Sequence, residues 1–199
     1  MALARPPRGI QSTPLITAQV APAELIRISS HLTGEPYFGR SGANRFDDHR
    51  RPKKNRFGTC YFGLTLAVAF AETVLHDELP VNGKFPMTWE KLEALYVVRF
   101  SGAVLTLADL TGVALKRSGA DSSISTACPY DLPQRWSVAI HKHPQRVDGI
   151  LYMSRQLNTE KAVVVFDRAR RKVRTPRSVP LPIFPEAWRT AFAMGVTPE

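Results

Sequence analysis

The sequence predicts a single α+β domain. Strand-like and helix-like segments follow one another without strict alternation, which favours an α+β fold over a doubly wound one. The chain has 199 residues, a length typical of one domain. Hydrophobic residues make up 44% and charged residues 22% of it, which is ordinary for a globular protein. We therefore expect one packed core, and the sequence shows no internal repeat.

The first half of the chain predicts two strands and a buried helix around a long loop. Residues 23–29 and 59–62 have strand-like side-chain patterns. After Gly63, Thr65 can cap a helix that is apolar almost all round until Glu72. Residues 31–55 are rich in Gly, Arg, Asp and Pro and predict a long ordered loop.

The second half predicts further strands and helices. The Ser-Gly pair at 101–102 separates two strand-like segments and suggests a hairpin. Pro133 suits the first turn of a helix, and Gly195 ends the last one. The expected strands are residues 95–100, 104–107, 149–154 and 162–166, the last two central, the expected helices are 110–115, 133–142 and 185–194, and residues 168–177 are a basic stretch.

The ends and the cysteines suggest how the chain is organised. Residues 1–20 contain Arg and Pro but no apolar signal region, so we expect a loose tail followed by one domain over residues 21–199. No apolar run approaches the roughly 18 residues that cross a bilayer. Cys60 and Cys128 make no disulfide framework, which favours free thiols and a cytoplasmic protein.

The charge favours an anionic partner. The formal net charge is +10 and the pI is about 10.1, which suits nucleic acid, a phosphate-bearing ligand or an acidic protein. The run of basic residues at 49–56 lacks the interleaved aromatic residues that stack on bases. Direct nucleic-acid binding is therefore the less favoured reading, and a solvated loop or an electrostatic funnel for an anion explains the run equally well.

Glu72 is the first candidate for chemistry. Burying an ionised carboxylate on an apolar helix is costly unless another group binds it or it serves a function. The helical neighbours of Glu72, Val68 and Ala69, carry no charge. We expect any partner to come from a distant segment, where cations are abundant. A structural salt bridge, or a helix face turned to water, would also explain Glu72.

Four other residues are candidates, each with an ordinary alternative. Arg27 lies between two isoleucines of a strand and should face away from them, and a strand residue that faces solvent is its ordinary alternative. Arg45 lies in a Gly-rich loop whose backbone can approach a phosphate that Arg grips. Tyr61 and Ser154 are by default a core residue and a turn residue.

Metal chemistry is not indicated. His141, His143 and Cys128 have no second pair to complete a site, and neither a Walker loop nor a nucleophile elbow is present.

Three ordered motifs carry a family resemblance. The segments GANRFDD, FGTCYFGLTLAVAFAETVLHD and, much later, DGILYMSRQ resemble the RES-domain family, whose members include toxins of bacterial toxin–antitoxin pairs. The resemblance spans about residues 25–166. The turn reads Ala43-Asn44-Arg45-Phe46 where many members have Gly-Gly-Arg-Trp.

The resemblance implies a fold and an activity. The implied fold is that of the ADP-ribosyltransferases, a split mixed β-sheet with flanking helices and a cleft for NAD. The implied activity is attack on the nicotinamide–ribose bond of NAD, which is the substrate, without a metal. The implied partner is an Xre-type helix-turn-helix antitoxin that blocks the cleft.

The family pattern also implies roles for the candidate residues. It places Arg45, Glu72 and Ser154 in catalysis, and Arg27, Arg45, Tyr61 and Ser154 in binding NAD. The arginines would neutralise the pyrophosphate and Tyr61 would stack on nicotinamide. Glu72 would stabilise the positive charge that develops on the ribose. Ser154 would hydrogen-bond the ligand.

Three alternatives remain open from the sequence. The enzyme could degrade NAD as a glycohydrolase or as a phosphorylase, or it could transfer ADP-ribose to a protein. The basic runs at 49–56 and 168–177 could form a nucleic-acid-binding module that needs no Glu72. A protein-interaction domain without chemistry is the third possibility.

Overall fold

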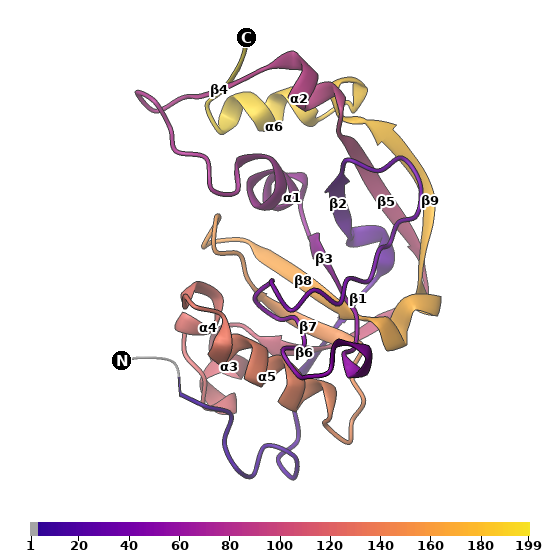
Figure 1. Cartoon of the computed structure of the whole chain (residues 1–199), viewed down its shortest axis with the longest axis vertical. Coiled ribbons are helices and arrows are strands. Elements are labelled where there is room, and N and C mark those ends of the chain that lie inside the picture. The colour runs from indigo at the N-terminus through magenta and orange to yellow at the C-terminus, as the bar shows by residue number, and fades with distance from the viewer. Residues whose placement is uncertain (1–3) are drawn as a thin grey trace.

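The computed structural model describes residues 4–199, apart from the side chains of residues 175 and 176. An eight-stranded mixed sheet dominates it, in the order β1-β6-β7-β8-β3-β2-β5-β9 (Figure 1). The α+β class is confirmed. The strands of this sheet are β1 (Thr17–Val20), β2 (Ile26–Ser29), β3 (Thr59–Gly63), β5 (Tyr96–Gly102), β6 (Leu105–Leu110), β7 (Gly149–Met153), β8 (Lys161–Phe166) and β9 (Val173–Pro180).

Short helices flank the two ends of the sheet (Figure 1). A second, parallel pair of strands joins β4 (Phe85–Met87) to β10 (Val196–Pro198) beside the upper helices. The helices α3 (Gly112–Ser118), α4 (Ser123–Thr126) and α5 (Asp131–His141) lie near β6 and β7, and α1 (Leu66–Phe70), α2 (Trp89–Glu93) and α6 (Ala187–Ala193) lie toward the other end.

The sheet is nearly split between β2 and β3. These antiparallel strands share a single register pair, Ile26 with Gly63, whereas β3 pairs with β8 along its whole length. The mixed sheet thus opens at one place, as a split sheet requires. Three buried clusters fill the surrounding core. The first contains Trp136 of α5, the second Phe62 of β3, and the third Phe70 of α1.

One sequence expectation about strands is wrong. Residues 95–100 and 104–107 form no hairpin, because β5 pairs with β2 and β9 while β6 pairs with β1 and β7. The chain turns at Gly102, whose φ of 136° suits glycine, and Ala103 N–H donates to the carbonyl of Lys172. Part of the basic stretch forms β9, whose charged residues are compatible with its place at the sheet edge.

The N-terminal segment differs from the expected loose tail. Residues 1–3 lie outside the described residues, but Thr17–Val20 is the edge strand β1, paired with β6. Ile10 is buried in the cluster around Trp136, and the Trp136 indole N–H donates to the carbonyl of Ala4. These residues are therefore part of the packed domain. Within residues 4–199, none of the helices has the length and apolar character that spanning a bilayer requires.

His141 gives the fold a pH dependence. Its ring stacks on Phe57 with centroids 3.9 Å apart. Burial, followed by the positive charge of Arg168, lowers the pKa of His141 from 6.5 to about 4. Between these values the unfolded chain binds a proton more readily than the folded one, so the free energy of unfolding falls as the pH falls through this window.

We predict that His141→Phe makes stability less sensitive to acid, because it keeps an aromatic ring on Phe57 and removes the titrating group. Urea unfolding of wild type and variant at about pH 7 and about pH 5 measures the difference. His31→Gln, at an exposed histidine, is the control. Equal losses of stability in wild type and His141→Phe would contradict the assignment.

Candidate active site

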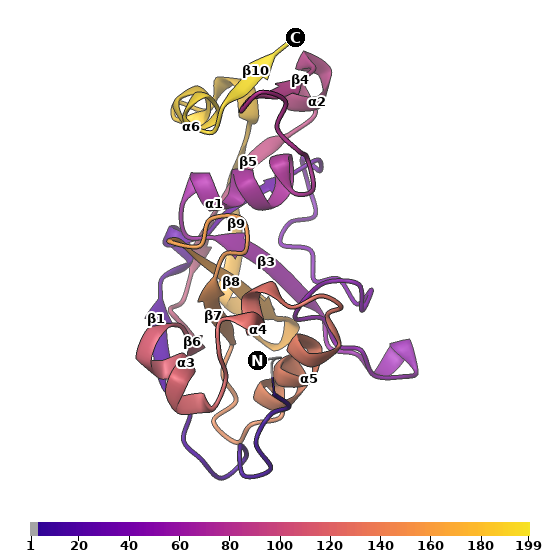
Figure 2. The same cartoon turned by 90° about the vertical axis from the view of Figure 1, so that its left-hand side faces the viewer.

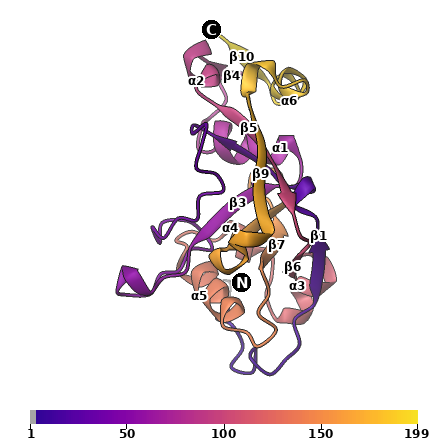
Figure 3. The ribbon, with the colours of Figure 1, turned by 90° about the vertical axis from the view of Figure 1, so that its right-hand side faces the viewer.

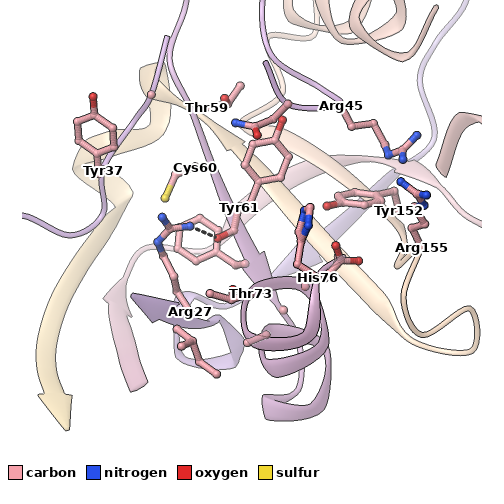
Figure 4. Close-up of a pocket in the computed structure, with 18 of the residues that line it drawn as sticks. Arg27, Tyr37, Arg45, Thr59, Cys60, Tyr61, Thr73, His76, Tyr152 and Arg155 are labelled. Atoms are coloured by element: carbon pink, nitrogen blue, oxygen red, sulfur yellow. Dashed lines mark hydrogen bonds between the residues drawn. The ribbon is translucent and has the colours of Figure 1, made fainter. Parts of the chain in front are cut away.

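A cavity of about 480 Å³ lies where β2 and β3 separate (Figure 4). Its walls come from β2, β3, the helix that begins with α1, the loop at residues 39–45 and the segment after β7. The volume is in the range of small-molecule binding sites. Four of the five candidate residues line it: Arg27, Arg45, Tyr61 and Glu72.

Glu72 reaches the cavity from an unusual turn. Thr65 caps α1 as expected, its hydroxyl accepting the N–H of Val68 at 3.2 Å. The helix then widens into a π-helical turn, Ala71–Leu75, closed by the N–H of His76 to the carbonyl of Ala71 at 2.8 Å. Turns of this kind occur frequently at functional sites.

The partner of the Glu72 carboxylate is a hydroxyl group. Ser154 Oγ donates to Glu72 Oε1 at 2.5 Å. Among the described residues, no Lys, Arg or His forms an ion pair with Glu72, so the expected cationic partner is not found. The other carboxylate oxygen remains available, because the Ser154 contact uses Oε1 alone.

Ser154 lies behind Glu72 at the end of β7. It is 2% exposed and is not among the residues that line the cavity. Its oxygen also accepts the N–H groups of Gln156 and Leu157, at 3.2 and 3.1 Å. The structure therefore places the Ser154 hydroxyl against Glu72 and outside the cavity lining, and the expected contact with a ligand stays a prediction.

Arg27 faces the opening while Ile26 and Ile28 pack in the core, as the alternation predicts. Its Nη1 donates to the carbonyl of Tyr61 on β3 at 3.1 Å, and its Nε pairs with Glu35 at 2.9 Å. Its charge is therefore already balanced by a carboxylate. Arg27 ties β2 to β3 across the gap in the sheet.

Arg45 has a different environment. It is 8% exposed, its Nη1 donates to the carbonyl of Ala127 at 2.8 Å, and its guanidinium lies 4.6 Å from the Tyr130 ring centroid. Burial lowers the pKa of Arg45, and nearby Tyr130 and Tyr152 partly offset this. No carboxylate within the described part of the chain forms an ion pair with it. A buried cation without an acid suits an anionic ligand.

The Arg45 loop is organised by Asp47, a residue that the sequence analysis did not single out. Asp47 is 1% exposed. Its carboxylate accepts neutral donors from the loop and from β3, which together satisfy the buried charge. These donors are Ser41 Oγ, Gly42 N, Asn44 N and Nδ2, Thr59 Oγ1 and Tyr61 Oη, at 2.6 to 3.3 Å.

Helix α5 and Tyr61 hold the same loop from two sides. Gln134 Nε2 donates to the carbonyls of Gly42 and Asn44, and Ser137 Oγ donates to that of Phe46. The Tyr61 hydroxyl accepts the N–H of Phe46 at 2.9 Å and donates to Asp47. The ring of Tyr61 is consequently fixed in the cavity wall.

Three further residues that line the cavity are His76, Tyr152 and Arg155, which Figure 4 labels. Tyr152 is on the same face of β7 as Ser154, so alternation along the strand could have identified it. Burial, followed by the charge of Glu72, raises the pKa of Tyr152 above its ordinary value. Arg155 is exposed and forms no ion pair with any described residue.

The described residues contain no cluster of three His, Cys, Asp or Glu side chains that could hold a metal ion. His143 is buried with its Nε2 3.2 Å from the carbonyl of Thr13. Cys128 is exposed and Cys60 is buried, and both are free thiols. Burial raises the pKa of Cys60 to about 12, so its thiol is protonated at neutral pH.

Fold and site together define an α+β protein with a polar cavity at the opening of a mixed sheet, where one carboxylate faces arginines. The family model for the RES domain matches residues 24–188, and the chain belongs to this family. The resemblance seen in the three sequence motifs is thus confirmed.

Two known proteins are similar to the chain. A protein named "Probable toxin y4kH" of Sinorhizobium fredii (strain NBRC 101917 / NGR234) is 33% identical over 101 residues, which cover 50% of this chain and 79% of that protein. A chain from the crystal structure of the M. tuberculosis MbcT–MbcA toxin–antitoxin complex superposes with a TM-score of 0.62 at 14% identity. That match covers 94% of this chain and 98% of the other, and supports the fold.

We predict that Asp47→Asn lowers the free energy of unfolding by about 2–3 kcal/mol, because one of its oxygens becomes an NH₂ group that faces other donors. Urea unfolding measures the change. Asp77→Asn, at a carboxylate that is 78% exposed, is the matched control and should change stability by less than about 0.5 kcal/mol. Equal stability of wild type and Asp47→Asn would show that the buried carboxylate does not organise the loop.

Proposed function

We propose that the protein is a cytoplasmic toxin of a toxin–antitoxin pair that cleaves the nicotinamide–ribose bond of NAD and so arrests growth. The observation that carries the proposal is the Glu72 carboxylate in a cavity with Arg45, which has no acidic partner among the described residues. Membership of the RES family and similarity to a protein named as a probable toxin support it.

The proposed chemistry needs a carboxylate beside the ribose. As the bond from ribose C1′ to nicotinamide nitrogen breaks, its electron pair leaves with nicotinamide and positive charge develops on the sugar. Glu72 stabilises that charge through the oxygen that Ser154 does not occupy. An acceptor oxygen then bonds to C1′ and releases its proton. Water as acceptor yields ADP-ribose, and a protein side chain yields an ADP-ribosylated protein.

The other cavity residues bind and position NAD in this proposal. Arg45 and Arg155 have no acid to neutralise them and face the anionic pyrophosphate. Tyr61, held by Asp47, offers a ring for stacking on nicotinamide. Arg27 acts mainly by maintaining the opening between β2 and β3, because Glu35 already balances its charge.

We also propose that the partner is an antitoxin with a helix-turn-helix of the Xre type that covers the cavity. The structural neighbour was solved as a toxin–antitoxin complex, which supports an antitoxin partner of some kind. A short neighbouring gene encoding a helix-turn-helix protein is the simplest genetic support.

We predict that Glu72→Gln lowers the rate of NAD loss by about 10²-fold or more and relieves growth inhibition, because the amide cannot stabilise the cationic sugar. NAD consumption by purified protein measures the rate. Glu93→Gln, on an exposed face of α2, should retain wild-type activity. Loss of NAD at the wild-type rate in Glu72→Gln would refute the proposal. With adenine-labelled NAD, label on protein means transfer, and free ADP-ribose means hydrolysis.

For Ser154→Ala we predict that kcat falls about tenfold or more while KM changes little, because Glu72 loses the group that orients it. Steady-state kinetics separates the two parameters. Stability should fall by about 2–3 kcal/mol, because the substitution removes all three hydrogen bonds of this buried hydroxyl. A large rise in KM at constant kcat would instead indicate that Ser154 binds the ligand directly.

A further inference from the structure

A basic arm, residues 49–56, projects from the body of the protein beside the cavity. Figures 2 and 3 show it as the one-turn helix that extends sideways beyond β3. Its turn is the 3₁₀ helix Lys53–Asn55, and residues 51–55 are all exposed. The proposed chemistry assigns no role to this segment.

The base of the arm is held firmly. Arg50 binds Asp48 through Nε and Nη2, at 2.9 and 2.6 Å, and Asp48 is 2% exposed. Arg56 donates to the backbone carbonyls of Arg50, Arg40 and Ser41. An exposed segment anchored in this way presents its side chains from a defined position.

Four cations of the arm form no ion pair within the described part of the chain: Arg56, which binds backbone carbonyls, and the exposed Arg51, Lys53 and Lys54. The nearby acids are already used, because Asp48 binds Arg50 and Asp167 binds Arg40. Uncompensated like charges on one turn repel each other and cost stability. A partner that carries negative charge would remove that cost.

The arm also adjoins the site. Lys53 lines the cavity that contains Glu72. The Arg56 guanidinium packs against Gly42 so closely that a Cβ there would lie 2.5 Å from Nη1. Gly42 belongs to the loop that Asp47 organises around Arg45. A partner bound to the arm therefore lies at the mouth of the cavity and against the loop that carries its buried arginine.

The surroundings favour protein carboxylates over nucleic acid as the anion. Phe57, the aromatic residue next to the arm, is 6% exposed and stacked on His141, so it offers no surface to a base. Three exposed cations within residues 51–54 also match a cluster of carboxylates better than a long row of phosphates. Charge complementarity across an interface guides such a partner to its place.

We propose that the basic arm is a docking site for an acidic segment of a partner protein, which lies across the mouth of the cavity. The proposal does not depend on the cleavage of NAD. Binding is measured without turnover, so its failure and the failure of the proposed chemistry are distinguishable.

The test is fluorescence anisotropy with a labelled peptide of about twelve residues in which Glu alternates with Ser. We expect the triple variant Arg51→Glu/Lys53→Glu/Lys54→Glu to bind it at least about tenfold more weakly than wild type. The matched control, Lys116→Glu/Arg117→Glu/Arg189→Glu, makes the same change in net charge at exposed positions on α3 and α6. It should bind less than about threefold more weakly than wild type.

Three outcomes would overturn the proposal. Equal losses in the arm variant and the control would mean that only net charge attracts the peptide. Unchanged binding by a folded arm variant would exclude the arm. Tighter binding of a random DNA duplex, lost in the arm variant and retained in the control, would assign the arm to nucleic acid. If charge reversal unfolds the protein, Arg51→Gln/Lys53→Gln/Lys54→Gln should still weaken peptide binding relative to wild type.

Discussion

The opening of the sheet between β2 and β3 is the constraint on which the site depends. Beyond the single pair Ile26–Gly63, β3 lacks strand pairing with β2, and a buried carbonyl without a donor would be costly. The Arg27 guanidinium supplies that donor to Tyr61, and Glu35 balances its charge. One side chain thus keeps the two strands connected while leaving space for a ligand.

The charges around this space fall into two groups. Arg27 and Asp47 are satisfied within the protein, the first by a carboxylate and the second by neutral donors, and they maintain the architecture. Arg45 and Glu72 form no ion pair among the described residues, and both line the cavity. Charges of opposite sign that form no ion pair create a strong local field for a ligand that carries both signs.

Features that depend on neighbouring residues could be predicted from the sequence, and features that depend on distant segments could not. The Thr65 cap and the alternation around Arg27 depend on near neighbours, so both were predicted. The role of Asp47 depends on donors from separate segments, which no spacing reveals. The hairpin prediction failed because both strands pair with distant segments, β5 with β2 and β9, and β6 with β1 and β7. Tyr152 could have been found by counting two residues back from Ser154.

The π-helical turn makes the site sensitive to chain length. A π turn holds one more residue than an α turn, and each residue of an α-helix rotates the next by roughly 100°. Deleting one residue from Ala71–Leu75 would restore regular geometry and shift the register of everything beyond the deletion. Because Glu72 is the second residue of this turn, a deletion after it would leave the register of Glu72 on α1 unchanged and would move His76, which lines the cavity, out of its place.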